Sequence, residues 1–104
     1  MLVSYKICNS LGSCSESDII AGIEKASDPN ADGNTNDHYD ILSLSVGGFG
    51  DPNDAKSKAI DNAVNAGVVA VIAAGNSGPS ENSIGSPGNA RRAITVGATY
   101  KDDN

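Results

Sequence analysis

The sequence has few aromatic residues and few positive charges. Its 104 residues include no tryptophan and one phenylalanine, and 7 Lys and Arg against 13 Asp and Glu leave a net charge of −6. This balance argues against a nucleic-acid partner, because binding a phosphate backbone requires clustered Lys and Arg. No stretch approaches the roughly 20 apolar residues that span a bilayer, and no apolar run follows a charged N-terminal region. We therefore expect no membrane contact and no signal peptide in this chain.

The shortage of large side chains and the short length limit the hydrophobic core. A chain of 104 residues has room for one domain, which we place at residues 1–104, with a core of Ile, Val, Leu and Ala. The two cysteines, Cys8 and Cys14, flank a short loop, and their C-x5-C spacing matches neither the common zinc patterns nor C-x-x-C redox chemistry. A disulfide and two free thiols both remain open, and the disulfide is favoured if the protein is secreted.

Apolar runs and their flanking residues predict four strands and two helices. The strands are expected at residues 2–8, 40–46, 68–74 and 92–98. One helix is expected over residues 15–27, with Ser15 as its N-cap. The other is expected to begin with Asp51 as N-cap and Pro52 as first residue, and to end at Gly67.

The order of these elements predicts an α/β fold. Strand, helix, strand, helix, strand, loop and strand follow one another, and parallel neighbours need the long crossovers that the helices supply, so we expect a parallel sheet of about four strands. If the strands lie in sequence order, right-handed crossovers place both helices on one face. The other face and the free edge of the first strand would then be bare, which indicates a part of something larger or an oligomer.

Residues 28–39 are expected to be a polar loop insertion with an incomplete calcium pattern. The loop begins with the D-x-[DN]-x-[DN]-G opening of a calcium-binding loop. Where an EF-hand places its bidentate Glu, this sequence has Tyr39, so other oxygen atoms, such as those of Asp40 or of backbone carbonyls, would have to complete the set. A solvated loop bonded to its own backbone is the alternative. The candidate ligands are Asp28, Asn30, Asp32 and Asp37.

The segment VIAAGNSGPS, residues 71–80, changes from apolar to polar at Asn76. This position follows a predicted parallel strand, at the sheet edge where open α/β folds place their ligands. An Asn amide offers two uncharged N–H donors, which suit a negative oxygen that develops only in a transition state. Asn is also a common turn residue, so the composition by itself leaves both roles open.

Three segments together resemble the subtilisin-like serine proteases: DILSLSVGG, AGVVAVIAAGNSGP and IGSPGNARRAITVGA, in that order and spacing. The resemblance covers essentially the whole chain and implies part of a subtilisin-like α/β/α fold, a peptide or protein substrate and a secreted or extracellular parent protein. It implies that Asn76 is the side-chain donor of the oxyanion hole, and that the Ser86–Pro87 bond is cis. The implied substrate-binding residues are Ser45, Val46, Gly47 and Gly48 along the peptide backbone, Ala73, Ala74 and Gly75 as one wall of the S1 pocket, and Gly85 at its base, where a glycine leaves room for a large apolar side chain.

The sequence lacks the catalytic motifs that the resemblance would require. Acyl transfer needs a serine nucleophile, a histidine base and an orienting aspartate. The family's G-T-S-M-A, H-G-T and D-[ST]-G strings do not occur in the 104 residues, and the single histidine, His38, is expected to be a solvated loop residue. The chain resembles the interval between the catalytic histidine and serine. We therefore expect the parent to be an endopeptidase and the isolated chain to be inactive.

Two other kinds of function remain as alternatives. A non-catalytic module that associates with itself through the bare sheet face or edge is one. A nucleotide-binding α/β module is the weaker one, because Gly48-Phe49-Gly50 begins a G-x-G-x-x-G pattern whose third glycine is replaced by Asn53.

Overall fold

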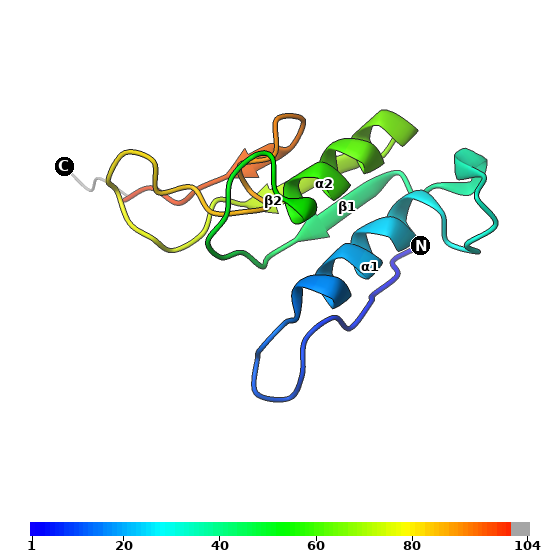
Figure 1. Cartoon of the computed structure of the whole chain (residues 1–104), viewed down its shortest axis with the longest axis horizontal. Helices are drawn as coiled ribbons and strands as arrows, with labels where there is room; N and C mark the ends of the chain where they lie inside the picture. Colours follow the sequence, from blue (N-terminus) through cyan, green and yellow to red (C-terminus); the bar gives the residue numbers. More distant parts are fainter. Residues whose placement is uncertain (101–104) are drawn as a thin grey trace.

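The computed structural model describes residues 1–100 and contains one three-stranded parallel sheet with two helices (Figure 1). The strands lie in the order β1-β2-β3, which is also their order in the sequence. Ile41 pairs with Val69 between β1 and β2, and Val71 pairs with Ile94 between β2 and β3. The elements are α1 (Glu16–Ser27), the 3-10 helix η1 (Thr35–Asp37), β1 (Ile41–Leu44), α2 (Ala55–Ala66), β2 (Val69–Ala73) and β3 (Ile94–Val96). The α/β class and the parallel sheet are confirmed, although three strands form instead of four.

Both helices are capped by polar side chains at their N-termini. Ser15 Oγ accepts the backbone N–H of Asp18 at 3.2 Å, as expected for the N-cap of α1. The expected start of α2 was wrong: its N-cap is Asp54, whose Oδ1 accepts the N–H of Ser57 at 2.9 Å. Asp51 forms a turn instead, because its Oδ1 accepts the N–H two residues later, at 2.7 Å. Gly67 ends α2 in the left-handed conformation, with φ 116°, where glycine avoids the strain of a Cβ.

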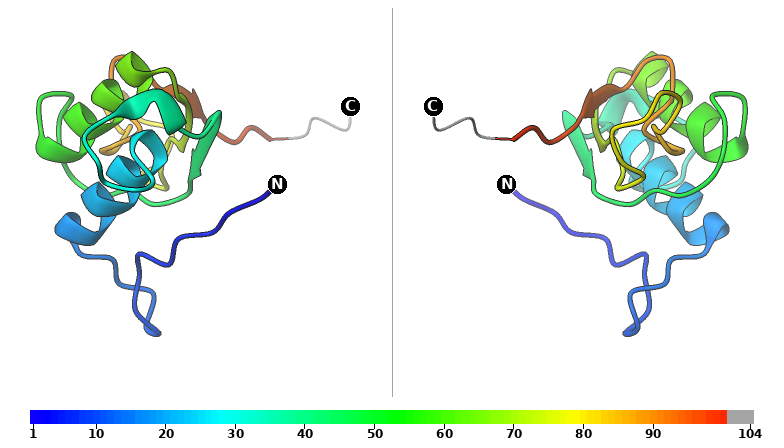
Figure 2. Two further views of the ribbon diagram at one scale, coloured as in Figure 1. Left: turned by 90° about the vertical axis from the view of Figure 1, so that its right-hand side faces the viewer. Right: turned by 90° about the vertical axis from the view of Figure 1, so that its left-hand side faces the viewer.

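The core lies between one face of the sheet and the two helices. Both helices lie on the same side of the sheet, as the sequence-order topology predicts (Figures 1 and 2). Aliphatic side chains fill the space between the layers, and Ile60 and Ile72 are fully buried there. The buried hydrophobic residues are Ile19, Ile23, Ala26, Leu44, Ile60, Ala63, Val68, Ala70, Ile72 and Ala90.

The opposite face of the sheet is bare. Four large aliphatic side chains from all three strands are exposed on it, because alternate residues of a strand point to opposite faces. This agrees with the expectation of an uncovered face and differs from the expectation that residues 68–74 are buried on both sides. The exposed fractions are 65% for Ile41, 45% for Val69, 54% for Ile94 and 53% for Val96.

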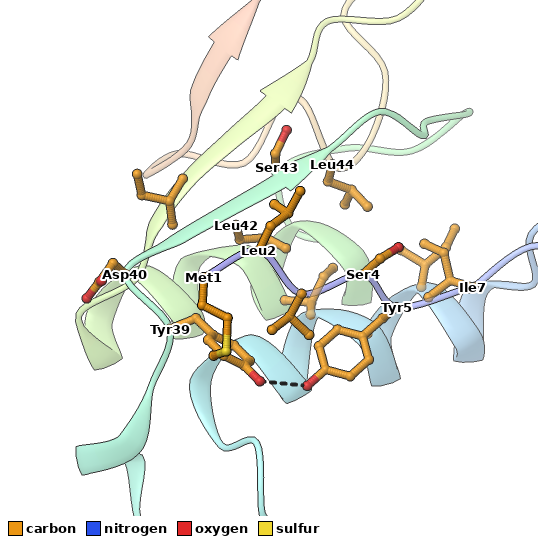
Figure 3. A pocket seen from close by; sticks show the side chains of 15 residues that line it. Met1, Leu2, Ser4, Tyr5, Ile7, Tyr39, Asp40, Leu42, Ser43 and Leu44 are labelled. Atoms are coloured by element: carbon orange, nitrogen blue, oxygen red, sulfur yellow. Dashed lines mark hydrogen bonds between the residues drawn. The ribbon is translucent and has the colours of Figure 1, made fainter.

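The expected strand at residues 2–8 does not form. A cavity of about 630 Å³ separates this segment from the edge strand β1, and residues 1–5 and 40–44 line its two sides (Figure 3). A strand needs a neighbouring backbone to receive its hydrogen bonds, and β1 lies beyond this cavity. The segment is held instead by a hydrogen bond between the Tyr5 and Tyr39 hydroxyls, at 3.1 Å. Leu2 is 97% exposed, and Ile7 is the apolar side chain of the segment that packs against the core.

The two cysteines close a small loop beside this segment. Cys8 and Cys14 form a disulfide and an isolated antiparallel backbone bridge. Asn9 organises the loop between them, since its Oδ1 accepts the N–H groups of Leu11 and Ser13, each at 3.0 Å. Of the two possibilities left by the spacing, the structure has the disulfide.

Among residues 1–100, no helix is long and apolar enough to cross a membrane.

Candidate peptide-binding groove

A groove at the carboxyl end of the sheet brings the predicted site residues together. Its volume is about 650 Å³, and it opens where the chain leaves β1 and β2. Parallel strands direct their carboxyl ends to one edge, which is why the segments that follow β1, β2 and β3 meet here. All of the residues predicted as catalytic or substrate-binding border this groove. They are Ser45, Val46, Gly47, Gly48, Ala73, Ala74, Gly75, Asn76 and Gly85.

Two backbone pairings join the walls of the groove. Gly48 N–H donates to the Ser86 carbonyl at 3.0 Å, and Ser86 N–H donates back to the Gly48 carbonyl at 2.9 Å. On the other side, Gly85 N–H donates to the Ala74 carbonyl at 3.2 Å. The segment at Gly85 and Ser86 therefore spans from the wall after β1 to the wall after β2.

Gly85 is required by the close approach of two backbones. A Cβ at this position would lie 2.7 Å from the Gly48 carbonyl oxygen, so any side chain would push the two segments apart. A Cβ at Gly48 would meet nothing within 4 Å. From the sequence, Gly85 was expected to leave room for a large substrate side chain. The structure gives another reason for glycine there, namely the close pairing of Gly48 with Ser86.

Asn76 lies on the surface at the end of this groove. It follows Gly75, whose φ of 101° turns the chain away from the line of β2. Asn76 is exposed, so its amide is accessible to a bound molecule. It also borders a second cavity of about 530 Å³, which lies between Gly78, Pro79 and Ile84 on one side and residues 97–100 on the other.

A buried polar cluster adjoins the groove, and the sequence analysis did not find it. Ser57 of α2 and Ser86 are both fully buried, and their Oγ atoms lie 3.0 Å apart. Ser86 Oγ donates to Asp54 Oδ1 at 2.8 Å, and Ser57 Oγ donates to Asn89 Oδ1 at 2.8 Å. The N-cap pattern at Asp54 was the one local sequence signal for this cluster. Its other contacts, Asp54 with Ser86 and Ser57 with Asn89, each join residues 32 positions apart.

The Asp54 carboxylate is stabilised by these contacts. Its partial burial opposes ionisation, but hydrogen bonds from the Ser57 backbone and from the Ser86 and Ser57 side chains outweigh that effect. As a result the pKa of Asp54 lies below its ordinary value of 3.8. Asp54 is therefore charged at neutral pH and acts as an acceptor in this cluster.

The loop at residues 28–39 brings together the three carboxylates among its candidate metal ligands. One carboxylate oxygen each from Asp28, Asp32 and Asp37 lies within 4.8 Å of the others, and η1 folds Asp37 back toward Asp28. Asn30, the remaining candidate, hydrogen-bonds to Asp32 inside the loop: its Oδ1 accepts the N–H of Asp32 and its Nδ2 donates to Asp32 Oδ2, each at 3.2 Å. Gly33 N–H donates to Asp28 Oδ2 at 2.8 Å.

His38 is half-buried, in contrast to the expectation of a solvated residue. Its Nδ1 lies 2.8 Å from the Tyr39 carbonyl oxygen. A Cβ at Gly67 would meet the His38 ring at 2.6 Å, so the ring packs over the end of α2. This contact places His38 far from the groove residues in the fold and gives it a packing role.

Comparison with known proteins agrees with this geometry. The subtilase family model, Peptidase_S8, matches residues 1–104. The solved structure of sphericase superimposes with a TM-score of 0.76 at 36% identity, covering 95% of this chain and 31% of that chain.

Similar sequences in curated proteins are considerably longer. The minor extracellular protease Vpr of Bacillus subtilis is 41% identical over 99 residues, 94% of this chain and 11% of that protein. Serine protease AprX of Bacillus subtilis is 41% identical, covering 99% of this chain and 24% of that protein. Subtilisin DY of Bacillus licheniformis is 38% identical, covering 99% of this chain and 35% of that protein. The chain thus spans about a third or less of these relatives, and it belongs to the subtilase family of serine proteases.

Proposed function

We propose that the groove holds an extended peptide and that the whole protein hydrolyses peptide bonds through an acyl-enzyme intermediate. The observation that carries this proposal is that all nine predicted residues border one groove at the carboxyl end of the sheet. The glycines at Gly47 and Gly48 let a peptide backbone approach the edge of the segment after β1 and pair with it. Family membership supports a peptide or protein as substrate.

Asn76 is proposed as a donor to the oxyanion. When a nucleophile attacks the scissile carbonyl, the oxygen becomes negative, and an uncharged amide N–H stabilises that charge more than it stabilises the ground-state carbonyl. The exposed Asn76 side chain at the end of the groove is suited to this role. In subtilisin, the well-known example of such a donor, replacing the asparagine lowers kcat by a factor on the order of 10² to 10³.

The isolated chain is proposed to be inactive, because the family's nucleophile, base and orienting aspartate motifs do not occur in its 104 residues. A fluorophosphonate probe, which reacts with activated serines, tests this proposal when incubated with the chain with and without calcium. We expect no labelling, while an active subtilisin treated in parallel is labelled fully. Stoichiometric labelling of any serine of the chain would refute the proposal.

Peptide binding is tested separately from catalysis. We expect acetyl-Ala-Ala-Ala-Leu-amide to shift the NMR signals of the Ser45 to Gly48 amides, since these residues line the groove. Gly48→Val should abolish the shifts, because its Cβ would meet no protein atom within 4 Å and the added side chain would take up space beside the peptide. Asn62→Val, on the exposed side of α2, is the matched control. Unchanged peptide binding by the Gly48 variant would place the peptide elsewhere.

The loop at residues 28–39 is proposed to bind a calcium ion. Three carboxylates converge there within 4.8 Å, and carboxylate oxygens are among the ligands that Ca²⁺ prefers. Calcium binding to the folded chain alone should raise the melting temperature. We expect Ca²⁺ to do so in the wild type and not in Asp37→Asn, with Mg²⁺ as the comparison ion. An equal melting temperature with Ca²⁺ and with chelator would refute the site.

Self-association is the second candidate function for the isolated chain. The exposed side chains of Ile41, Val69 and Ile94 form an apolar surface that a second copy would cover. We expect the mass measured by light scattering to rise with concentration, and Val69→Lys to return it to the monomer value. Asn62→Lys adds the same charge on α2 and is the control. A monomer at all concentrations would refute this proposal.

An extracellular location is proposed for the parent protein. The Cys8–Cys14 disulfide supports it, because disulfides persist in oxidising compartments. The similarity to the minor extracellular protease Vpr also supports it. Immunodetection in the culture medium of the source organism, compared with its cell pellet, tests the location, and detection in the pellet alone would contradict it.

A further inference from the structure

The buried cluster of Asp54, Ser57 and Ser86 connects α2 to the segment that spans the groove. Ser57 lies in the first turn of α2, and Asp54 is the N-cap of the same helix. Ser86 uses its side chain to donate to Asp54 Oδ1 at 2.8 Å and its backbone to pair with Gly48 in both directions. One residue thus joins a rigid helix to the wall of the groove.

Asn89 adds a second connection between the same two regions. Its Oδ1 accepts the Ser57 hydroxyl at 2.8 Å, and its Nδ2 donates to the Gly50 carbonyl at 3.0 Å. Gly50 lies two residues after the Gly48 that pairs with Ser86. The segment between β1 and α2 is therefore fixed at two points: Gly48 pairs with Ser86, and the Gly50 carbonyl accepts from Asn89.

Burial makes the geometry of this cluster costly to change. Ser57 and Ser86 are fully buried, so a hydroxyl that loses its partner here loses its hydrogen bond without access to water. In the described residues no buried side-chain polar atom lacks a partner. The cluster consequently favours one position of Ser86. Because Ser86 pairs with Gly48, this position also fixes the distance between the two walls of the groove.

We propose that Asp54, Ser57 and Ser86 are positioning residues of the peptide groove. None of the three lines the groove. They act through the Ser86 backbone, which fixes Gly48 on one wall, and through the neighbouring Gly85, which donates to the Ala74 carbonyl on the other. The role in peptide binding rests on the function proposed above, whereas the control of the Gly48–Ser86 pairing does not.

Hydrogen exchange of the whole 104-residue chain tests the pairing directly, without any peptide. The Gly48 amide is the probe, because it donates to the Ser86 carbonyl, and the Ile72 amide in the core strand is the reference for overall stability. We expect Ser86→Ala and Asp54→Ala each to speed Gly48 exchange about tenfold relative to Ile72, in line with the loss of a buried hydrogen bond. Asp54→Asn retains an acceptor oxygen and should keep Gly48 near the wild-type rate.

Ser15→Ala is the matched control. It removes the N-cap of α1, whose side chain hydrogen-bonds to Ser17 and Asp18, so Gly48 exchange should stay unchanged relative to Ile72. If Asp54→Ala fails to fold, Ser86→Ala decides the question, because it leaves the cap of α2 intact. Parallel acceleration of Gly48 and Ile72 would show a purely structural role and overturn the proposal.

Affinity for acetyl-Ala-Ala-Ala-Leu-amide then tests the consequence for binding. We expect Ser86→Ala to weaken the affinity for the peptide about fivefold, which is typical of a lost hydrogen bond. Asp54→Asn should preserve the affinity, because it retains an acceptor oxygen. If the wild type does not bind the peptide, the proposed function fails, while the exchange result still decides whether the cluster holds the pairing. Unaltered affinity in Ser86→Ala, with faster Gly48 exchange, would overturn the positioning role in binding.

Discussion

The two faces of the sheet carry similar aliphatic side chains but differ in what covers them. Ile72 on the helix side is fully buried, whereas Val69, three residues earlier on the same strand, is 45% exposed on the other side. The apolar run from Val68 to Ala74 does not distinguish the two directions. The arrangement of the helices does, because both crossovers place them on one face. Burial, and not hydrophobicity alone, therefore decides which side chains hold this fold together.

Truncation of one residue on each face gives the largest expected contrast. We expect Ile72→Ala to lower the free energy of unfolding by about 2–5 kcal/mol, because it removes buried methyl groups and leaves a cavity. Val69→Ala should change it by less than about 0.5 kcal/mol in the monomer, as is usual for surface positions. Urea unfolding of both variants measures the difference. Equal losses would mean that the second face is covered in solution.

Two glycines of the groove offer the next contrast between a closed and an open position. Gly85→Ala should destabilise the chain by about 1–3 kcal/mol, as overpacked positions do, because the Cβ would lie 2.7 Å from the Gly48 carbonyl. Gly48→Ala has open space around its Cβ and should leave the stability nearly unchanged. Denaturant midpoints of the two variants decide the matter, and a larger loss for Gly48 than for Gly85 would contradict the geometry of the groove.

A smaller effect is expected at the cap of α1, the helix that packs on the covered face. Ser15→Ala should cost about 1 kcal/mol, because the Asp18 N–H loses its acceptor. Ser15→Asp retains an acceptor and should restore most of the stability. Thermal unfolding compares the three proteins. A Ser15→Asp variant as unstable as Ser15→Ala would argue against capping as the cause.

Acid should have the smallest effect, through Asp54. Its pKa is lower in the folded chain than the ordinary value of 3.8, so the unfolded chain binds the proton more readily. The associated stability is full above a pH of 3.8 and is lost as the pH falls below that value toward the folded pKa. Denaturation at a series of pH values should show a steeper loss for the wild type than for Asp54→Asn. Parallel curves would remove Asp54 from the acid response.

Local signals predicted well what local contacts determine. The cap of α1 was predicted correctly because Ser15 and its partner Asp18 are three residues apart. The start of α2 was misplaced because two local signals compete: Asp51 with Pro52, and Asp54 three residues later. Asp51 closes a turn with the N–H of Asn53, and Asp54 caps the helix while also accepting a hydrogen bond from Ser86, 32 residues away. The strand at residues 2–8 failed for a related reason, since its β propensity has no backbone partner beside it.

The site divides along the same line. The groove residues could be predicted because they lie in continuous motifs that resemble a known family, and the structure places them together. The contact between Ser57 and Asn89 could not be predicted, because it is a hydrogen bond across 32 residues, although Asn89 itself lies in the segment IGSPGNARRAITVGA. In the loop, the opening pattern of residues 28–33 named its candidate ligands locally, and the structure brings the carboxylates of Asp28, Asp32 and Asp37 within 4.8 Å of one another.

The register of the sheet has a consequence for the order of events during synthesis. Ile41 pairs with Val69, and Val71 pairs with Ile94. Each pairing can therefore form only after the chain between the two strands has been synthesised. A chain that leaves the ribosome from its N-terminus can form β1, α2 and β2 before Gly85 and Ser86 emerge. The groove needs the segment at Gly85 and Ser86 and also Val96, Gly97 and Ala98, which emerge later still. A nascent chain therefore acquires its scaffold first and its peptide-binding surface only after the segment at Gly85 and Ser86 has emerged.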